Sequence, residues 1–132
     1  MGGVGRRTVA PEVILEGHAP AVVAVANATR ALILGMIDGV AEAGHPGSKV
    51  IRFRRRGTFA FVAPRADHVR LGFEHGYALP DAAGLLEGEG GQVRHVTLRT
   101  TAEVTSRPVK MLVSAALFDD ETHGFRRRAV RP

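Results

Sequence analysis

Hydrophobic residues in the first third of the chain recur with the spacing of an α-helix. In the segment 19–37 the apolar positions are three or four residues apart, and Pro20 occupies a first-turn position, where a missing N–H costs nothing. The residues of this stripe are Val22, Val25, Thr29, Leu32, Ile33 and Met36. We predict an amphipathic helix here, with a short helical turn before it over 11–17 and another after it over 39–44, ended by its last glycine.

The middle of the chain changes to the two-residue alternation of β-strands. The alternating segments are 49–54, 58–62, 68–73 and 92–99. In the first of them Ile51 and Phe53 fall on one face while Arg52 falls on the other. Because short turns join the segments, we predict an antiparallel sheet, and we expect its aromatic residues, including Phe59 and Phe61, on the apolar face.

A second amphipathic helix follows Pro108, with apolar residues at the intervals that face a core. These residues are Val109, Leu112, Val113, Ala116 and Leu117. The order of elements indicates the α+β class: a two-layer sandwich with an antiparallel sheet of four or more strands and the N-terminal helices and the C-terminal helix packed on one face. We predict a single domain over 11–121, with flexible basic tails over 1–10 and 122–132.

The composition excludes several kinds of site. The chain has 132 residues, enough for one domain, and it has no cysteine, which excludes disulfides, thiolate metal ligands and cysteine nucleophiles. Its first ten residues carry arginines but no apolar run, so we recognise no secretory signal. Asn27, Thr29 and Arg30 lie within the apolar segment 19–37 and argue against a membrane span. We therefore expect a cytoplasmic protein that does not bind membranes.

Positive charge is concentrated on one face of the predicted sheet, and the formal net charge is +5. Alternation directs these side chains away from the helices: Arg52, Arg54, His68, Arg70, His95 and Arg99. A basic open sheet can bind RNA or single-stranded DNA, although such surfaces usually carry aromatic stacking residues. Nucleic-acid or other polyanion binding is therefore one hypothesis for this face, and self-association as a homodimer is another.

Polar residues also gather between the third and fourth predicted strands, in the segment 75–95. Asp81 has the position of a helix N-cap for 82–87, and Gly88 has the position of the stop, so both have structural explanations. Arg94 is different, because alternation places it on the apolar face, where a guanidinium needs a partner.

Three hypotheses account for Arg94. It can clamp the 76–91 turn to the sheet by pairing with acids or carbonyl groups of that turn. It can instead bind an anion or small ligand in a pocket with His75, Tyr77 and Asp81. A bulge or register shift that exposes it is the third.

Known catalytic and cofactor motifs do not occur in the sequence. The glycines of 88–91 lack the Lys-Ser/Thr and the helix that complete a phosphate-binding loop. His68 and His95 offer at most a two-histidine site, and there is no HExxH pattern and no nucleophile elbow. We predict no catalytic residue, no metal ligand and no cofactor, and we expect a non-enzymatic domain that binds a small ligand or a protein partner.

The segment 67–99 resembles the core signature of the YdhG-like bacterial domains of unknown function. The matching residues are Leu71-Gly72-Phe73, Gly76, Leu79-Pro80-Asp81, Leu85-Leu86-Glu87-Gly88, Gly90 and Val93-Arg94-His95. The likeness is specific over this third of the chain and looser, but collinear, through 30–34, the arginine-rich strand and the last helix. It implies a compact α+β fold.

One branch of that family is linked to frataxin-like intracellular iron delivery. Such a role requires clustered Asp and Glu residues, because iron held in this way prefers hard oxygen ligands. In this chain the first long helix carries Arg30 and almost no acid, and the domain is basic. The iron hypothesis is therefore disfavoured, and no iron ligands are carried over.

Overall fold

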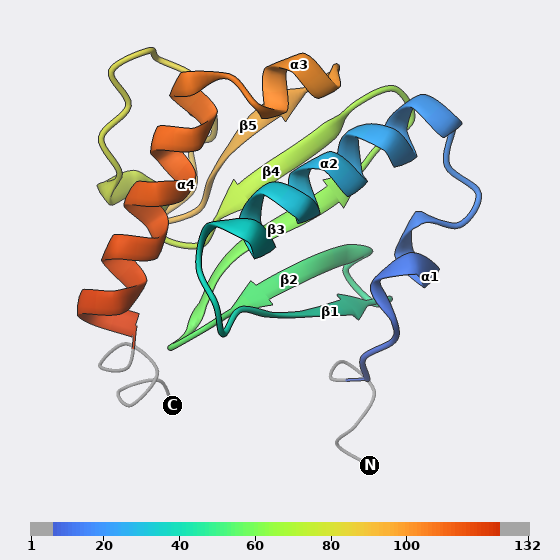
Figure 1. The fold of residues 1–132 in the computed structure, drawn as a ribbon, viewed down its shortest axis with the longest axis horizontal. Helices are drawn as coiled ribbons and strands as arrows, with labels where there is room; N and C mark the ends of the chain where they lie inside the picture. The colour runs from blue at the N-terminus through green and yellow to red at the C-terminus, as the bar shows by residue number, and fades with distance from the viewer. Residues whose placement is uncertain (1–6, 125–132) are drawn as a thin grey trace.

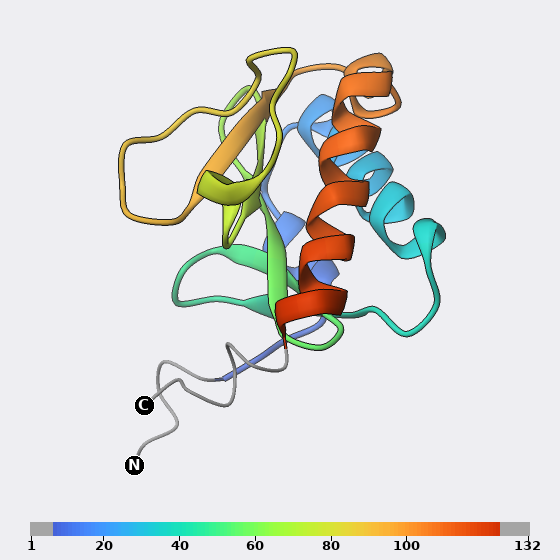
Figure 2. The same cartoon turned by 90° about the vertical axis from the view of Figure 1, so that its left-hand side faces the viewer.

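Two layers make up the computed structural model of the chain, which describes residues 7–124. Five antiparallel strands form one sheet in chain order, and the helices cover one of its faces (Figure 1, Figure 2). The strands are β1 (Ala41–His45), β2 (Val50–Arg54), β3 (Thr58–Pro64), β4 (Val69–Phe73) and β5 (Arg94–Leu98). The helices are α1 (Pro11–Leu15), α2 (Pro20–Met36), α3 (Thr101–Val104) and α4 (Arg107–Asp119), with short turns η2 (Gly76–Ala78) and η3 (Asp120–Gly124). The predicted α+β sandwich is confirmed.

The core lies between the sheet and the two long helices. α2 crosses β3 and β4, while α4 runs beside it over the same face (Figure 1). The largest side chains that are fully buried there include Phe53, Phe73, Ile33, Ile51, Leu71 and Leu98. Over residues 7–124, no helix combines the length and the apolar character needed to span a membrane.

The predicted helical turn over 39–44 is wrong, because this segment contains β1. Ala41–His45 pairs with β2, and Glu42 reaches across to α2, where Arg30 donates from Nε to its Oε1 at 2.8 Å. Gly44 does not end a helix. A Cβ at this position would lie 2.8 Å from Cγ1 of Ile14 and 2.9 Å from Cγ2 of Val9, so the glycine permits close packing of the N-terminal segment on β1.

A β-bulge separates the two phenylalanines of β3. Phe53 pairs with Ala60 while Arg54 pairs with Thr58, so Phe59 is the extra residue and turns into the core with 3% of its surface exposed. Phe61 is the direct partner of Arg52 and therefore lies on the opposite, outer face. The expectation that both rings face the core is wrong for Phe61.

The segment 82–87 is not helical. Asp81 does cap backbone groups, but the chain makes only a turn closed by the Gly84 N–H to the Asp81 carbonyl at 3.1 Å. It then runs extended to a bridge between Glu87 and His95 beside β5. Gly84 (φ +70°) and Gly88 (φ +127°) bend this path. A positive φ is incompatible with a right-handed helix, so the segment cannot be helical at these positions.

Ordered structure extends beyond 11–121 at both ends. Val9 forms a bridge with Gly44, and η3 continues to Gly124. The buried Asp120 at the start of η3 accepts hydrogen bonds from the N–H groups of Arg56 and Gly57 at 2.9 and 2.8 Å. The remainder of both predicted tails lies outside the described residues. α3 was not predicted, although Thr100 and Glu103 form the capping box that a Thr-x-x-Glu sequence indicates.

Candidate functional site

Asp81 holds the loop that follows η2. Its Oδ1 accepts the N–H of Leu85 at 2.8 Å, and its Oδ2 accepts the N–H of Leu86 at 2.9 Å. Both carboxylate oxygens therefore bind the backbone of their own loop, and a charged acceptor makes these bonds stronger than neutral ones. The geometry makes Asp81 an anchor for the 81–86 turn.

Arg94, His75 and Tyr77 meet at the segment that leads into β5. Arg94 lies opposite Phe73 on the helix-facing side, and its Nη1 donates to the carbonyls of Gly90 at 3.0 Å and Val93 at 2.8 Å. The Nδ1 of His75 lies 3.1 Å from the side-chain oxygen of Gln92, whose carbonyl accepts the Tyr77 N–H at 3.0 Å. These contacts fasten η2 and the 90–93 segment together. Asp81 takes no part in these contacts, because its carboxylate accepts from Leu85 and Leu86 of its own turn.

Two glycines allow this close approach. A Cβ on Gly76 would lie 2.5 Å from the Cβ of Arg94 and 2.9 Å from its backbone nitrogen, and one on Gly88 would lie 3.4 Å from its Cδ. The hollow beside His75, between the sheet and α4, measures about 10 Å³. A cavity of that size holds at most about one water molecule. The space between His75 and α4 is therefore too small for a ligand.

On the outer face of the sheet, acids accompany most of the predicted basic residues. Arg52 pairs with Glu74 at 3.0 Å. Asp67 lies 2.7 Å from His68 and 3.4 Å from Arg99. The Glu87 side chain contacts β5 from the neighbouring loop. Its Oε1 lies 3.2 Å from the Nε2 of His95 and accepts a hydrogen bond from the Oγ1 of Thr97. These acids offset much of the positive charge that alternation alone predicts for this face.

Arg70 and Phe61 occupy the middle of the same face. No acid among residues 7–124 forms an ion pair with Arg70, and its buried Nε has no hydrogen-bond partner there. Phe61 leans over Gly72, where a Cβ would lie 2.0 Å from the ring Cζ. Partial burial, together with the Arg70 guanidinium, lowers the pKa of His95 below its usual value. The Phe61 ring and the Arg70 guanidinium thus lie side by side on the neighbouring strands β3 and β4 of this face.

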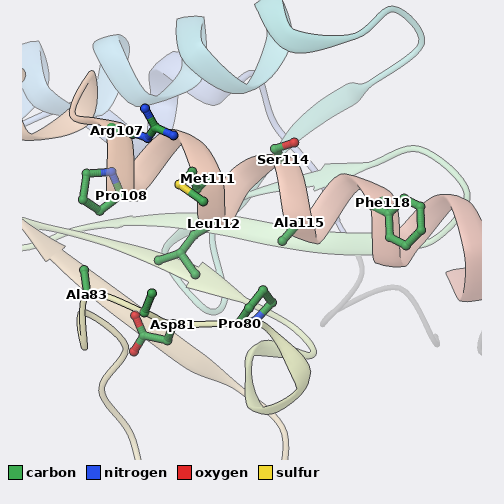
Figure 3. A pocket seen from close by; sticks show the side chains of 11 residues that line it. Pro80, Asp81, Ala83, Arg107, Pro108, Met111, Leu112, Ser114, Ala115 and Phe118 are labelled. Atoms are coloured by element: carbon green, nitrogen blue, oxygen red, sulfur yellow. The ribbon is translucent and has the colours of Figure 1, made fainter.

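A larger hollow lies on the other side of the loop, between residues 80–83 and α4. The groove has a volume of about 620 Å³, and Figure 3 shows the loop along one side and the helix along the other. Its lining is Pro80, Asp81, Ala82, Ala83, Arg107, Pro108, Met111, Leu112, Ser114, Ala115 and Phe118. A volume of this order is typical of binding sites, and the lining is mostly apolar, as such sites usually are.

The groove has an apolar wall because α4 is apolar on two sides. Its inner stripe is buried against the sheet, while Met111 and Phe118 point outward and expose 57% and 73% of their surfaces. Met111, Ser114, Ala115 and Phe118 follow helical spacing, so the sequence did contain this second stripe. The stripe was missed because the small residues in its middle make it weakly hydrophobic.

Polar groups at the groove are few. Asp81 already satisfies two backbone N–H groups, and Arg107 stands exposed at the N-terminal end of α4, with Phe118 at the far end (Figure 3). Across residues 7–124 no three side chains of His, Asp or Glu are grouped to hold a metal ion.

Comparisons with protein-family models, with curated proteins and with solved structures find no match to this chain.

Proposed function

We propose that this chain is a non-catalytic interaction domain that binds a protein partner through the groove between residues 80–83 and α4. The observation that carries the proposal is the double-sided apolar character of α4, with Met111 and Phe118 exposed beside a groove of about 620 Å³. Exposed apolar surface that is contiguous and shaped in this way marks interaction sites, whereas single exposed apolar residues do not.

The surroundings of the groove support binding over catalysis. The carboxylate that lines it, Asp81, accepts two backbone hydrogen bonds and has no histidine or hydroxyl donor among its hydrogen-bond partners. Ser114 is exposed on α4, where its side chain forms no hydrogen bond with a base among residues 7–124. A nucleophile needs a base within hydrogen-bonding distance, and this arrangement lacks one.

The apolar dye Nile red tests whether the groove is a binding surface. We expect dilute wild-type protein to bind the dye with a blue-shifted emission, and Ser114→Asp to weaken that binding at least about fivefold by placing a charge in the apolar surface. Ala31→Asp is the matched control, because Ala31 is an exposed helical residue of α2 that lies outside the groove. Equal dye binding by both variants, or no binding by the wild type, would reject the groove as the interaction surface.

A second candidate is single-stranded nucleic-acid binding on the outer sheet face, favoured by Phe61. This ring lies next to the unpaired Arg70, and a base stacked on an aromatic side chain near a cation is a common mode of recognition. Its test is the affinity for a labelled oligonucleotide over a salt series. Binding that weakens with salt and falls in Phe61→Ala supports it, and no binding at low salt rejects it.

We also infer that the chain is a YdhG-like domain. Support comes from the structural roles of the signature positions: Gly72 lies under Phe61, Gly76 approaches Arg94, and Asp81 caps its loop. Residue types that a fold needs for close approach and capping are those that a family signature would contain. An experimental structure of a YdhG-like protein tests this, and different contacts at the corresponding glycines and aspartate would count against membership.

A further inference from the structure

The outward stripe of α4 is symmetric about its own middle. Ser114 and Ala115 are small and lie at the centre, Met111 comes three residues before Ser114, and Phe118 comes three residues after Ala115. A helix with this pattern presents a large apolar residue at equal distances on either side of a shallow centre. Such a surface is complementary to itself when a second copy runs in the opposite direction.

We propose that the occupant of the groove is a second copy of this chain, with the two α4 helices antiparallel across a two-fold axis between Ser114 and Ala115. The inference rests on the proposed function and names its partner. The axis sets Met111 of one copy opposite Phe118 of the other, twice. The small central residues let the helices approach to about 8 Å, near the lower limit for packed helices.

The shape of the groove fits this arrangement. Phe118 projects at the C-terminal end of the groove with 73% of its surface exposed, and the groove runs from there along α4 to Pro108 at the N-terminal end of the helix. Antiparallel docking carries each Phe118 ring toward the hollow of the other copy. Each protomer thus supplies one projecting ring and one recess, which is what a closed symmetric dimer requires.

The direction of the helices also suits the charge at the end of the groove. Arg107 is exposed at the N-terminal end of α4, and antiparallel docking brings it near the C-terminal turn of the partner's α4, where carbonyl groups carry negative partial charge. A parallel arrangement would instead bring the two Arg107 side chains together.

Sedimentation equilibrium of the full chain tests the proposal. We expect a reversible dimer in the wild type, and we expect Phe118→Asp to raise its dissociation constant at least about tenfold, since large side chains that fill a recess of the partner dominate affinity. Ala31→Asp on α2 should dimerise like the wild type. Phe118 is mostly exposed, so unfolding should be unchanged in the variant. A wild type that stays monomeric at high concentration, or a Phe118→Asp variant that dimerises normally, would overturn the proposal.

Cysteine cross-linking tests the orientation of the two helices, because the chain contains no cysteine of its own. Ser114→Cys lies beside the axis and should give a covalent dimer by oxidation or with a short bismaleimide, while Ala31→Cys should not. A dimer that cross-links at Ala31→Cys but not at Ser114→Cys would contradict the α4 arrangement.

The dye experiment separates the two proposals. Nile red binding in the groove of a protein that never dimerises would keep the interaction surface and reject the second copy as its occupant. Absence of both dye binding and dimerisation would reject both.

Discussion

The two sides of the loop between β4 and β5 differ in what they leave unsatisfied. On the side that faces β5, the Arg94 guanidinium donates to the carbonyls of Gly90 and Val93, and the His75 ring contacts the Gln92 side chain. On the side that faces α4, apolar side chains line an open groove of about 620 Å³. The polar groups of this segment are thus bonded within the fold, whereas the surface that stays exposed beside it is apolar.

The difference shows that charged residues gathered in one segment of the sequence can be bonded within the fold. Asp81 and Arg94 would be costly in a partly buried position without partners, so the fold supplies backbone groups to both. Met111 and Phe118 are not buried within the fold, since another stripe of α4 packs against the core. Contiguous exposed apolar residues of this kind are the observation on which the proposed interaction surface rests.

Replacing Gly76 should have the largest effect on the anchored side. In Gly76→Ala the new methyl group would overlap the Cβ and backbone nitrogen of Arg94, at 2.5 and 2.9 Å, and backbone atoms cannot swing aside. We expect a loss of about 3 kcal/mol in the free energy of unfolding, measured by urea denaturation. Gly90→Ala is the control, because nothing lies within 4 Å of a Cβ there. Equal stability of the two variants would show that the loop is not anchored at Gly76.

Removing the Asp81 carboxylate should affect both sides of the loop. Asp81→Ala leaves the N–H groups of Leu85 and Leu86 without their acceptor, and we expect a loss of about 2 kcal/mol in the free energy of unfolding. Because the 80–83 wall of the groove is then less rigid, Nile red binding should also weaken. Full stability in Asp81→Ala, with dye binding intact, would break the distinction between anchor and groove.

Truncating Arg94 should affect the anchored side alone. Arg94→Ala removes two hydrogen bonds to the carbonyls of Gly90 and Val93, and we expect a loss of about 1 kcal/mol, measured by thermal unfolding and urea denaturation. Dye binding and dimerisation should stay at the wild-type level. If added phosphate raised the melting temperature of the wild type but not of Arg94→Ala, Arg94 would be an anion site rather than a clamp.

The smallest expected effect is the pH dependence that His95 brings to the outer face. Its pKa is lowered in the folded protein by burial and by Arg70, so below neutral pH the unfolded chain binds more protons than the folded one. Stability should therefore decrease as the pH falls through the usual histidine range around 6.5, and His95→Gln should reduce that decrease. His45, whose pKa burial also lowers, contributes in the same direction. An identical pH profile of the melting temperature in His95→Gln would reject this assignment.

Long elements with strong periodicity could be predicted from the sequence, and short ones could not. The stripes of α2 and α4 and the alternation in β2 and β4 are repeated often enough to identify the element. β1 carries Ala, Glu and Gly, which favour strands poorly, and it is a strand because β2 and the N-terminal segment pair and pack with it. The turn at 82–87 has helix-forming residues, but its path is set by Asp81 and by pairing with β5.

Some features of the candidate site could likewise be predicted from the sequence, and others could not. The unusual position of Arg94 on the apolar face, and the capping role of Asp81, followed from alternation and residue type. The acids that accompany the basic face could not be foreseen, because Glu74, Glu87 and Asp67 reach it from turns whose direction depends on neighbouring strands. Phe61 joined that face because one extra residue in β3 reversed the alternation at Phe59.

By itself the sequence determined the α+β class, the two long helices, most of the sheet and the identity of the residues that would need partners. Those features depend on repeated local spacing and on the cost of burying charge, both of which act on any fold the chain could adopt. Only the tertiary structure decided which partners those residues obtained and which surface was left without one. That outcome depends on contacts between distant segments: Gly76 and Arg94 hold the loop after η2 against β5, and the groove is the space that remains between residues 80–83 of this loop and α4.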